Sequence, residues 1–312
     1  MTGPRRIAVG WLACLCLLAA ACLEVSTAQA PTPDPAEDST PAPASQPPLG
    51  NAARMPEQII ATPLGAETAP AVTHLPLSLL APSAAEAAGE LGENVGIAVY
   101  YPSEGRIYEY NAQAQFELVS VVKVPIMLTL LDKAIAERRQ LTADETALVT
   151  AMIRESDNDA TTALWYELGG AKTVQRFLDS AGVSGATIDP HDWGDSVMPA
   201  AAGAELLGKL VEGQILDASS RQFAMRLMSE VDPSQDWGAV TVSSFAAETG
   251  VKNGWYPEHD GWVLNSFGYA LPDDASPEYT IAIFSRGHAT FGQGRQAIEE
   301  LASLIHLDAA SR

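Results

Sequence analysis

The stretch SVVKVPIMLTLL, residues 120–131, predicts a buried helix around which the rest of the chain can be arranged. A helix that is apolar on all sides belongs in a core. Pro125 has no amide hydrogen and fits a first turn, so we expect the helix to start just after Ser120. Lys123 then lies one turn further on the same face, where burial disfavours its charged form. The pattern places a candidate nucleophile beside a candidate amine base, although a capping serine and a lysine that reaches water would also fit.

The composition argues against several classes of function. The chain has 312 residues, of which 47% are apolar and 18% are charged, so a sizeable core is available. Its net charge of −21 argues against nucleic acid or an anionic lipid surface as an electrostatic partner. The cysteines Cys14, Cys16 and Cys22 all lie near the N-terminus, and the five histidines are scattered. We therefore predict no disulfide in the rest of the chain, no metal site and no cofactor.

The N-terminus is typical of a secretion signal. Arg5 and Arg6 precede an apolar run over residues 7–23. Small residues then lead into Cys22, an arrangement that resembles the lipobox of bacterial lipoproteins, with Cys22 as the lipidated residue. We predict a signal peptide over residues 1–21 and a lipid anchor in the outer face of the cell membrane. The alternatives are an ordinary signal peptide, which would give an extracellular product, and an uncleaved anchor; all three place the remainder outside the cytoplasmic membrane.

A proline-rich spacer is expected between this signal and the folded part. Residues 31–48 contain seven prolines among Thr, Ser, Ala and Asp. Such a stretch cannot bury enough apolar surface to fold. We predict a linker over residues 22–75 and one folded domain, expected to be monomeric, over residues 76–312.

Hydrophobic periodicity within the domain predicts strands at both ends and helices between them. The expected strands are 95–101, 106–110, 249–256, 262–271 and 279–286. The expected helices are 120 to about 139, 142–155, 158–168, 171–180, 200–212, 217–231 and 294–306, with a loop at 184–199. This order implies an α+β fold. The N- and C-terminal segments would form one antiparallel sheet flanked by helices, and the middle helices would form a subdomain of their own.

Three short motifs lie on these elements. SVVK at 120–123 opens the buried helix, SDN at 156–158 joins two helices, and KNG at 252–254 lies on the first strand after the helices. Singly, the second motif is also a good helix cap and the third could be a plain strand end. In this order they resemble the penicillin-recognising serine hydrolases, class A β-lactamases in particular, over about residues 95–306. The segment 195–201 also resembles the one that closes the Ω-loop in that family. The resemblance implies the β-lactamase/transpeptidase-like fold.

The resemblance also implies catalytic roles in acyl transfer to serine. Ser120 would attack a carbonyl carbon, and Lys123 would accept its proton directly or through water. Ser156 would relay a proton to the leaving nitrogen. Asp157, between these motif residues, is expected to be a helix cap and not a reactant.

Substrate binding would fall to the other motif residues. Asn158 would hold Lys123 and the substrate's amide side chain, and Lys252 would supply positive charge for a substrate carboxylate. Gly254 would let substrate lie close to the strand, and the backbone N–H groups of Ser120 and Trp255 would face the oxyanion. Asn253 departs from the family, which usually carries a hydroxyl residue there that helps bind the carboxylate; its amide could donate a hydrogen bond instead.

A second departure concerns deacylation. Class A β-lactamases carry a Glu-x-x-x-Asn pattern in the Ω-loop, whose glutamate activates the deacylating water. Residues 184–199 contain no glutamate, and apart from Asp195, which matches a structural position of the loop, their titratable residues are Asp189, His191 and Asp192. The sequence thus predicts acylation machinery clearly and deacylation machinery poorly.

Three functions remain open at this point. The first is an exported serine hydrolase that forms an acyl-enzyme at Ser120 on β-lactam or related amide substrates and deacylates weakly. The second is a penicillin-binding, D-Ala-D-Ala-type peptidase or amidase acting on peptidoglycan-derived peptides, in which Lys123 serves both half-reactions. The third is a tethered binding protein without turnover. The intact set of Ser120, Lys123, Ser156 and Lys252 argues against the third.

Overall fold

The structure is a computed structural model that describes residues 72–240, 246–272 and 277–310. Its strands are β1 (Thr73–Pro76), β2 (Val95–Tyr101), β3 (Arg106–Tyr110), β4 (Gln115–Glu117), β5 (Val197–Pro199), β6 (Ala246–Glu258), β7 (Gly261–Pro272) and β8 (Tyr279–His288). Its α-helices are α1 (Pro82–Leu91), α2 (Lys123–Ala136), α3 (Ala143–Arg154), α4 (Asn158–Leu168), α5 (Ala171–Ser180), α6 (Ala200–Val211), α7 (Ala218–Ser229) and α8 (Phe291–Ala310). Two short 3-10 turns, η4 (Val119–Val122) and η5 (Trp193–Asp195), bear on the site. No helix in the described ranges is long and apolar enough to cross a membrane.

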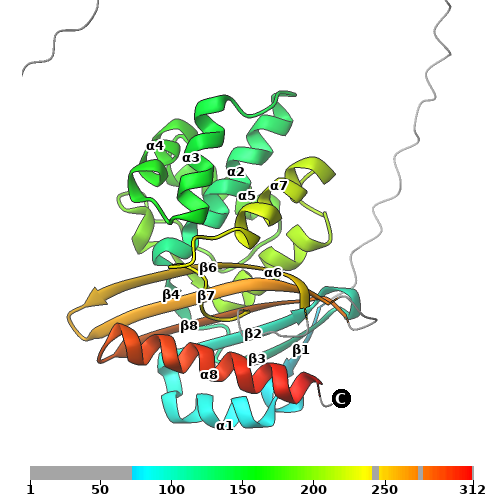
Figure 1. Ribbon diagram of the computed structural model, residues 1–312, viewed down its shortest axis with the longest axis vertical. Helices are drawn as coiled ribbons and strands as arrows, with labels where there is room; N and C mark the ends of the chain where they lie inside the picture. Colours follow the sequence, from blue (N-terminus) through cyan, green and yellow to red (C-terminus); the bar gives the residue numbers. More distant parts are fainter. Residues whose placement is uncertain (1–71, 241–245, 273–276, 311–312) are drawn as a thin grey trace, which may run out of the picture. The chain divides into compact units, whose positions relative to one another are not determined.

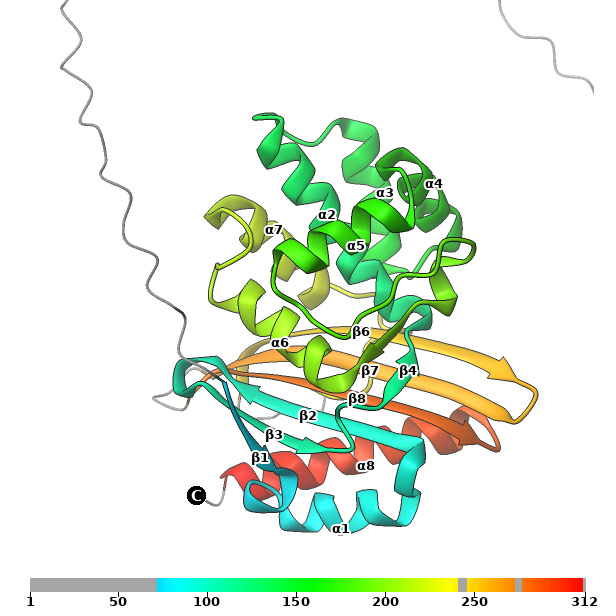
Figure 2. The same ribbon diagram turned by 180° about the vertical axis from the view of Figure 1, so that it is seen from behind.

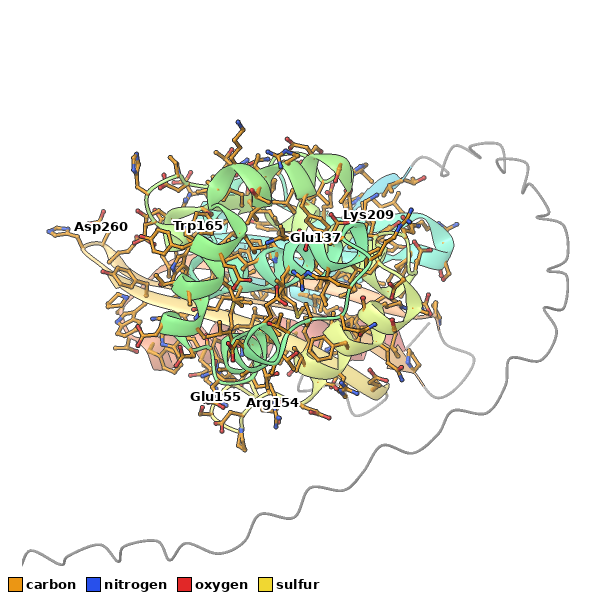
Figure 3. The ribbon with its side chains drawn as sticks, turned by 90° about the horizontal axis from the view of Figure 1, so that it is seen from above. Glu137, Arg154, Glu155, Trp165, Lys209 and Asp260 are labelled. Carbon is orange, nitrogen blue, oxygen red and sulfur yellow. The ribbon has the colours of Figure 1, made fainter. Side chains whose placement is uncertain are left out.

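A central sheet separates two helical layers. Six strands are hydrogen-bonded in the order β1-β3-β2-β8-β7-β6. Helices α1 and α8 cover one face, and the cluster of α2 to α7 lies on the other (Figure 1). Seen from behind, α6 lies along the sheet beneath the rest of that cluster (Figure 2). The hairpin between β6 and β7 extends to the periphery, where Asp260 projects away from the helices (Figure 3).

Strand β2 shows why the sheet is buried on both sides. All seven of its residues are buried. Successive side chains of a strand point to opposite faces, so Ala98 and Tyr100 join the core beneath the helical cluster, whereas Ile97 and Val99 join the core beneath α1 and α8. The unbroken apolar run in the sequence is the mark of this two-sided burial.

Helix α2 is the centre of the helical cluster, as its sequence predicts. Ten of its fourteen residues are buried, and Pro125 lies in its first turn. The next helix, α3, begins with a capping box: Thr142 accepts from the amide of Glu145, whose carboxylate accepts from the amide of Thr142.

The α+β fold and its order of elements are confirmed, with differences at the edges. The sheet is not wholly antiparallel, because β1 pairs in parallel with β3. The predicted linker, 22–75, therefore reaches too far: residues 73–75 lie in β1. A four-residue edge strand carries too short a pattern to be recognised before its partner strand is known. Helix α1 was not predicted; it has no side-chain cap to mark its start.

The loop predicted at 184–199 is largely present, but its end is a strand. Residues of β5 pair with β4 just before the 3-10 turn that holds Ser120, with Glu117 opposite Val197. Helix α6 follows at once, as expected for the segment 195–201. The predicted signal peptide, most of the predicted linker and Cys22 lie outside the described residues.

Candidate active site

Ser120 is held in a strained turn at the entrance of α2. Val119, the residue before it, has φ +50°, a conformation in which a β-branched side chain is rarely found and which costs about 1–3 kcal/mol. Long-range contacts hold this segment: Leu118 donates its amide to Ser196 O at 2.7 Å, and the buried Asn265 donates to Glu117 O at 2.5 Å. The surrounding structure thus maintains a backbone shape that the sequence would not adopt alone.

Strand β6 passes against this turn at Gly254. A Cβ atom at this position would lie 2.8 Å from both Leu118 O and Ser120 N, closer than real side chains approach backbone. Gly254, predicted to let substrate lie close to the strand, is thus already required by the close approach of the protein's own backbone. It brings the KNG motif, on β6, beside Ser120 at the start of α2.

Lys123 is completely buried and points into the junction of α3 and α4. Its Nζ donates to Ser156 O at 2.6 Å, to Asn158 Oδ1 at 2.7 Å and to Ser156 Oγ at 3.2 Å. None of these three bonds goes to Ser120. Burial lowers the pKa of Lys123 to about 7, against a smaller opposing effect of the Asp157 carboxylate. A lysine of this kind is available as a neutral base near neutral pH.

Ser156 joins this lysine to a second one. Its hydroxyl oxygen accepts a 2.9 Å hydrogen bond from Lys252 Nζ, which also donates to Asn253 O at 2.7 Å. Burial, and then the charge of Lys123, lower the pKa of Lys252 well below its usual value. The positive charge on each lysine disfavours protonation of the other. The pair therefore favours a state in which one lysine is charged and the other is neutral.

The residues of the SDN motif, 156–158, have the local roles predicted for them. Asp157 caps α4, accepting from the amide of Ala160 at 2.6 Å. Ser156 has φ +59°, which turns the chain so that both its carbonyl and its hydroxyl reach Lys123. Asn158, the first residue of α4, holds Lys123 as expected. The structure therefore brings Lys123, Ser156, Asn158 and Lys252 into one hydrogen-bonded network.

Asn253 does not take the place expected for it. Its side chain is 1% exposed, and Nδ2 already donates to Gln235 O at 2.8 Å and to Trp237 O at 2.9 Å. Both donors are used, so the expectation that this amide binds a substrate carboxylate is wrong for this conformation. Alternation along the strand explains the difference, because Asn253 points to the face opposite Lys252.

Trp255 lies on that same opposite face. Its ring lies 5.8 Å from that of Trp237 and 5.5 Å from that of Phe291 at the start of α8. The side chain therefore anchors β6 to the layer behind the sheet. Only its backbone N–H bears on the predicted oxyanion hole.

The loop at 184–199 presents an aromatic ring, and not a carboxylate, to Lys123. Trp193 lies with its ring centroid 5.1 Å from Lys123 Nζ, and its Nε1 donates to Thr162 Oγ1 at 3.3 Å. Asp189 accepts from the amides of His191 and Asp192, and backbone bonds from Asp192 and then His191 lower its pKa. Sequence reasoning missed Trp193, although it is the one large aromatic residue of the loop.

Comparison with known proteins places this geometry in a family. The sequence matches the β-lactamase enzyme family over residues 83–147 and 146–307. Among solved structures, a variant of the last common ancestor of Gram-negative class A β-lactamases is 21% identical, with 75% of this chain and 99% of that chain covered and a TM-score of 0.63.

Two further solved structures are similar. TLA-3 extended-spectrum β-lactamase is 17% identical, with 74% of this chain and 98% of that chain covered and a TM-score of 0.66. A β-lactamase from Chitinophaga pinensis is 18% identical, with 73% and 98% covered and a TM-score of 0.62. At such identities these structures establish the fold. The family match itself spans well over half of the sequence, and the chain therefore belongs to the β-lactamase enzyme family.

Proposed function

We propose that the protein is an exported serine hydrolase that forms an acyl-enzyme at Ser120 on β-lactams or related amide or peptide substrates. The observation that carries the proposal is the buried amine of Lys123. It lies one helical turn after a serine held in a strained turn, and its pKa is about 7. A serine hydroxyl is a weak nucleophile until a neighbouring base takes its proton.

The proposed steps follow from the network. Neutral Lys123 takes the proton of Ser120, and the Ser120 oxygen bonds to the carbonyl carbon. Because the three hydrogen bonds of Lys123 go elsewhere in the free protein, this transfer runs through a water or follows a turn of the lysine. The C–N bond then breaks, and the leaving nitrogen takes a proton from Ser156, which regains one from the lysines. The N–H groups of Ser120 and Trp255 would stabilise the oxyanion.

A penicillin-binding peptidase or amidase is the second candidate. The loop places the ring of Trp193, and not a carboxylate, against Lys123. This arrangement supports the second candidate, because a base that assists the attacking water is typically worth about 10²–10⁴-fold in the rate of deacylation. Such an enzyme would form a lasting adduct with a β-lactam. A rapidly hydrolysing enzyme would not accumulate one.

Intact-mass measurement after incubation with benzylpenicillin tests the proposal. We expect an adduct on Ser120 that forms faster than it hydrolyses, and its loss in Ser120→Ala. Ser103→Ala, which changes an exposed serine in a turn, is the matched control and should label normally. Labelling with a fluorophosphonate extends the test to other substrates. If no acylating probe modifies Ser120, the hydrolase proposal fails and a binding function gains support.

Export and lipidation at Cys22 belong to the same proposal. Mass spectrometry of the protein from a membrane fraction should find a lipid-modified Cys22 at the mature N-terminus. Cys22→Ser should release the protein or leave it unprocessed. An unmodified N-terminus in the wild-type protein would show that the lipid anchor is wrong.

A further inference from the structure

The positive end of the site lies on β6, at Lys252. It is the only lysine or arginine among the described residues of β6 and β7. Its side chain is buried, and Nζ donates to Ser156 Oγ at 2.9 Å and to Asn253 O at 2.7 Å. Burial, and then the charge of Lys123, lower its pKa and so favour the neutral amine. A neutral amine has two N–H groups, and these two acceptors use both.

The other donors beside this lysine are also engaged within the protein. Both N–H groups of the Asn253 amide go to backbone carbonyls, and its Oδ1, which has no partner among the described residues, is an acceptor that repels a carboxylate. Arg286, the one arginine of β8, lies over the ring of Phe116 at 5.1 Å and donates to Gln115 O at 3.4 Å. A substrate carboxylate beside Lys252 would therefore lose its water of hydration without gaining a charged partner, which is costly.

The opposite end of the site is acidic. Glu117 lies on β4, just before the turn that holds Ser120. Glu258 ends β6, and Asp195 lies in η5, which packs against that turn. A hydrogen bond with Glu258, and then burial, raise the pKa of Glu117 to about 7, and the charge of Asp195 adds to this shift. Because two carboxyls that share one proton still carry a negative charge, these side chains keep the potential beside Ser120 negative, as does the net charge of −21 of the whole chain.

We propose that the site at Ser120 prefers amides or esters with no carboxylate next to the bond that is cleaved. This inference rests on the proposed acyl-enzyme and narrows its substrates. The Ser120 oxygen bonds to the carbonyl carbon, the bond from that carbon to the leaving atom breaks, and the leaving atom takes up one proton while Ser120 gives one up to Lys123. An uncharged neighbour of that bond, such as a carboxamide or an ester group, enters the site without the cost of an unpaired charge.

The test compares two acyl donors that differ only in this charge. Benzylpenicillin carries a carboxylate one carbon from its lactam nitrogen, and its carboxamide is the neutral partner. Rapid mixing and quenching, followed by intact-mass measurement, gives the rate constant of acylation of Ser120. Each rate constant is divided by that of the same compound with hydroxylamine, so that intrinsic reactivity cancels. We expect the carboxamide to acylate about tenfold faster.

Salt provides a second readout of the same preference. Raising the ionic strength from about 0.01 M to about 1 M shortens the screening length from about 30 Å to about 3 Å. Acylation by benzylpenicillin should therefore become faster, because repulsion of its carboxylate weakens, and acylation by the carboxamide should change little. A carboxylate that the site attracts would show the opposite trend.

Matched variants assign the effect to the acidic end. Glu258→Gln removes one exposed carboxylate and should lower the ratio of carboxamide to benzylpenicillin rates about twofold to threefold. Glu300→Gln makes the same change of charge on α8, which covers the other face of the sheet (Figure 1), and should leave the ratio unchanged. A second pair of donors, the phenylacetyl thioesters of mercaptoacetate and mercaptoacetamide, repeats the comparison without a β-lactam ring.

The outcomes separate this inference from the function on which it rests. Equal rates within both pairs, or faster acylation by the charged members, would overturn the preference and leave the acyl-enzyme intact. If neither pair reacts while a fluorophosphonate labels Ser120, the preference also fails and the nucleophile stands. If no probe modifies Ser120, the proposed function and this inference fail together.

Discussion

On the serine side of the site, buried polar groups bond across elements that are far apart in sequence, whereas on the loop side, residues 184–199, most carboxylates bond to their own loop. Asn265 on β7 holds the segment before Ser120, and Lys252 on β6 reaches Ser156. Asp189 and Asp192, by contrast, bond amides two or three residues away. The first side is fixed by the whole fold, and the second mainly by local turns.

This contrast shows where reactivity resides. Groups held by distant elements are desolvated, so their pKa values move toward neutrality, as for Lys123. Asp189, by contrast, accepts from nearby amides, and these hydrogen bonds lower its pKa. The serine side should therefore be sensitive to substitution and to pH, whereas substitution of Asp189 should have little effect on the reaction.

The largest expected effect is loss of the base. Lys123→Met keeps the length of the side chain and removes its amine, so acylation by benzylpenicillin should slow by about 10²–10⁴-fold. Rapid mixing and quenching, followed by intact-mass measurement, gives the rate of acylation. Lys133→Met, later on the same helix, is the control and should acylate normally. Wild-type rates in Lys123→Met would show that another group takes the proton of Ser120.

The pH dependence of acylation sharpens the same point. Because the base must be neutral and the pKa of Lys123 is about 7, the rate should rise with pH and level off above that value. Below it, the rate should fall about tenfold per pH unit, as loss of one proton requires. Glu117 needs a control, since its hydrogen bond with Glu258 raises its pKa to about 7 as well. Glu117→Gln should leave the midpoint of the profile in place; a shifted midpoint would assign it to the carboxyl pair.

Asn253 should affect stability more than substrate binding. Asn253→Ala leaves the carbonyl of Trp237 without the amide donor, whereas the carbonyl of Gln235 still accepts from the backbone amide of Trp237, so we expect a loss of about 1–3 kcal/mol in the free energy of unfolding. Urea denaturation measures this loss. Gln113→Ala, an exposed amide, is the control and should change stability little. If Asn253→Ala were as stable as the wild-type protein but had a lower rate constant of acylation, Asn253 would again be a candidate substrate-binding residue.

The smallest expected effect is on the loop. Asp189→Asn keeps an oxygen that accepts from the amides of His191 and Asp192, so the lifetime of the acyl-enzyme should stay unchanged. His191→Ala removes an exposed side chain and should behave alike. Decay of the isolated adduct, followed by mass, gives the lifetime. A strongly lengthened lifetime in either variant would identify that residue as the deacylating base.

Local chemistry explains what could be predicted from the sequence. Pro125 places the first turn of α2, Thr142 and Glu145 form a capping box, and Asp157 caps α4; each signal lies within a few residues of the element that it starts. The order of strands and helices follows from apolar periods of two and about four residues. The members of the network were predicted because their motifs resemble those of a known family.

What could not be predicted depends on contacts between distant residues. Strand β1 exists because β3 lies beside it, and β5 because β4 does. The buried bonds of Asn253 depend on which face of β6 meets the segment of Gln235 and Trp237. Trp193 is placed over Lys123 by packing, and an aromatic residue in a loop carries no periodic signal.

The positive φ of Val119 has a consequence for engineering. Glycine adopts that backbone shape without penalty, so Val119→Gly should relieve a cost of about 1–3 kcal/mol, less the greater freedom that glycine gives the unfolded chain. The same replacement would also make the backbone that positions Ser120 more flexible. Selection for heat resistance alone would therefore tend to favour a more stable but slower enzyme, because this residue affects stability and activity in opposite directions.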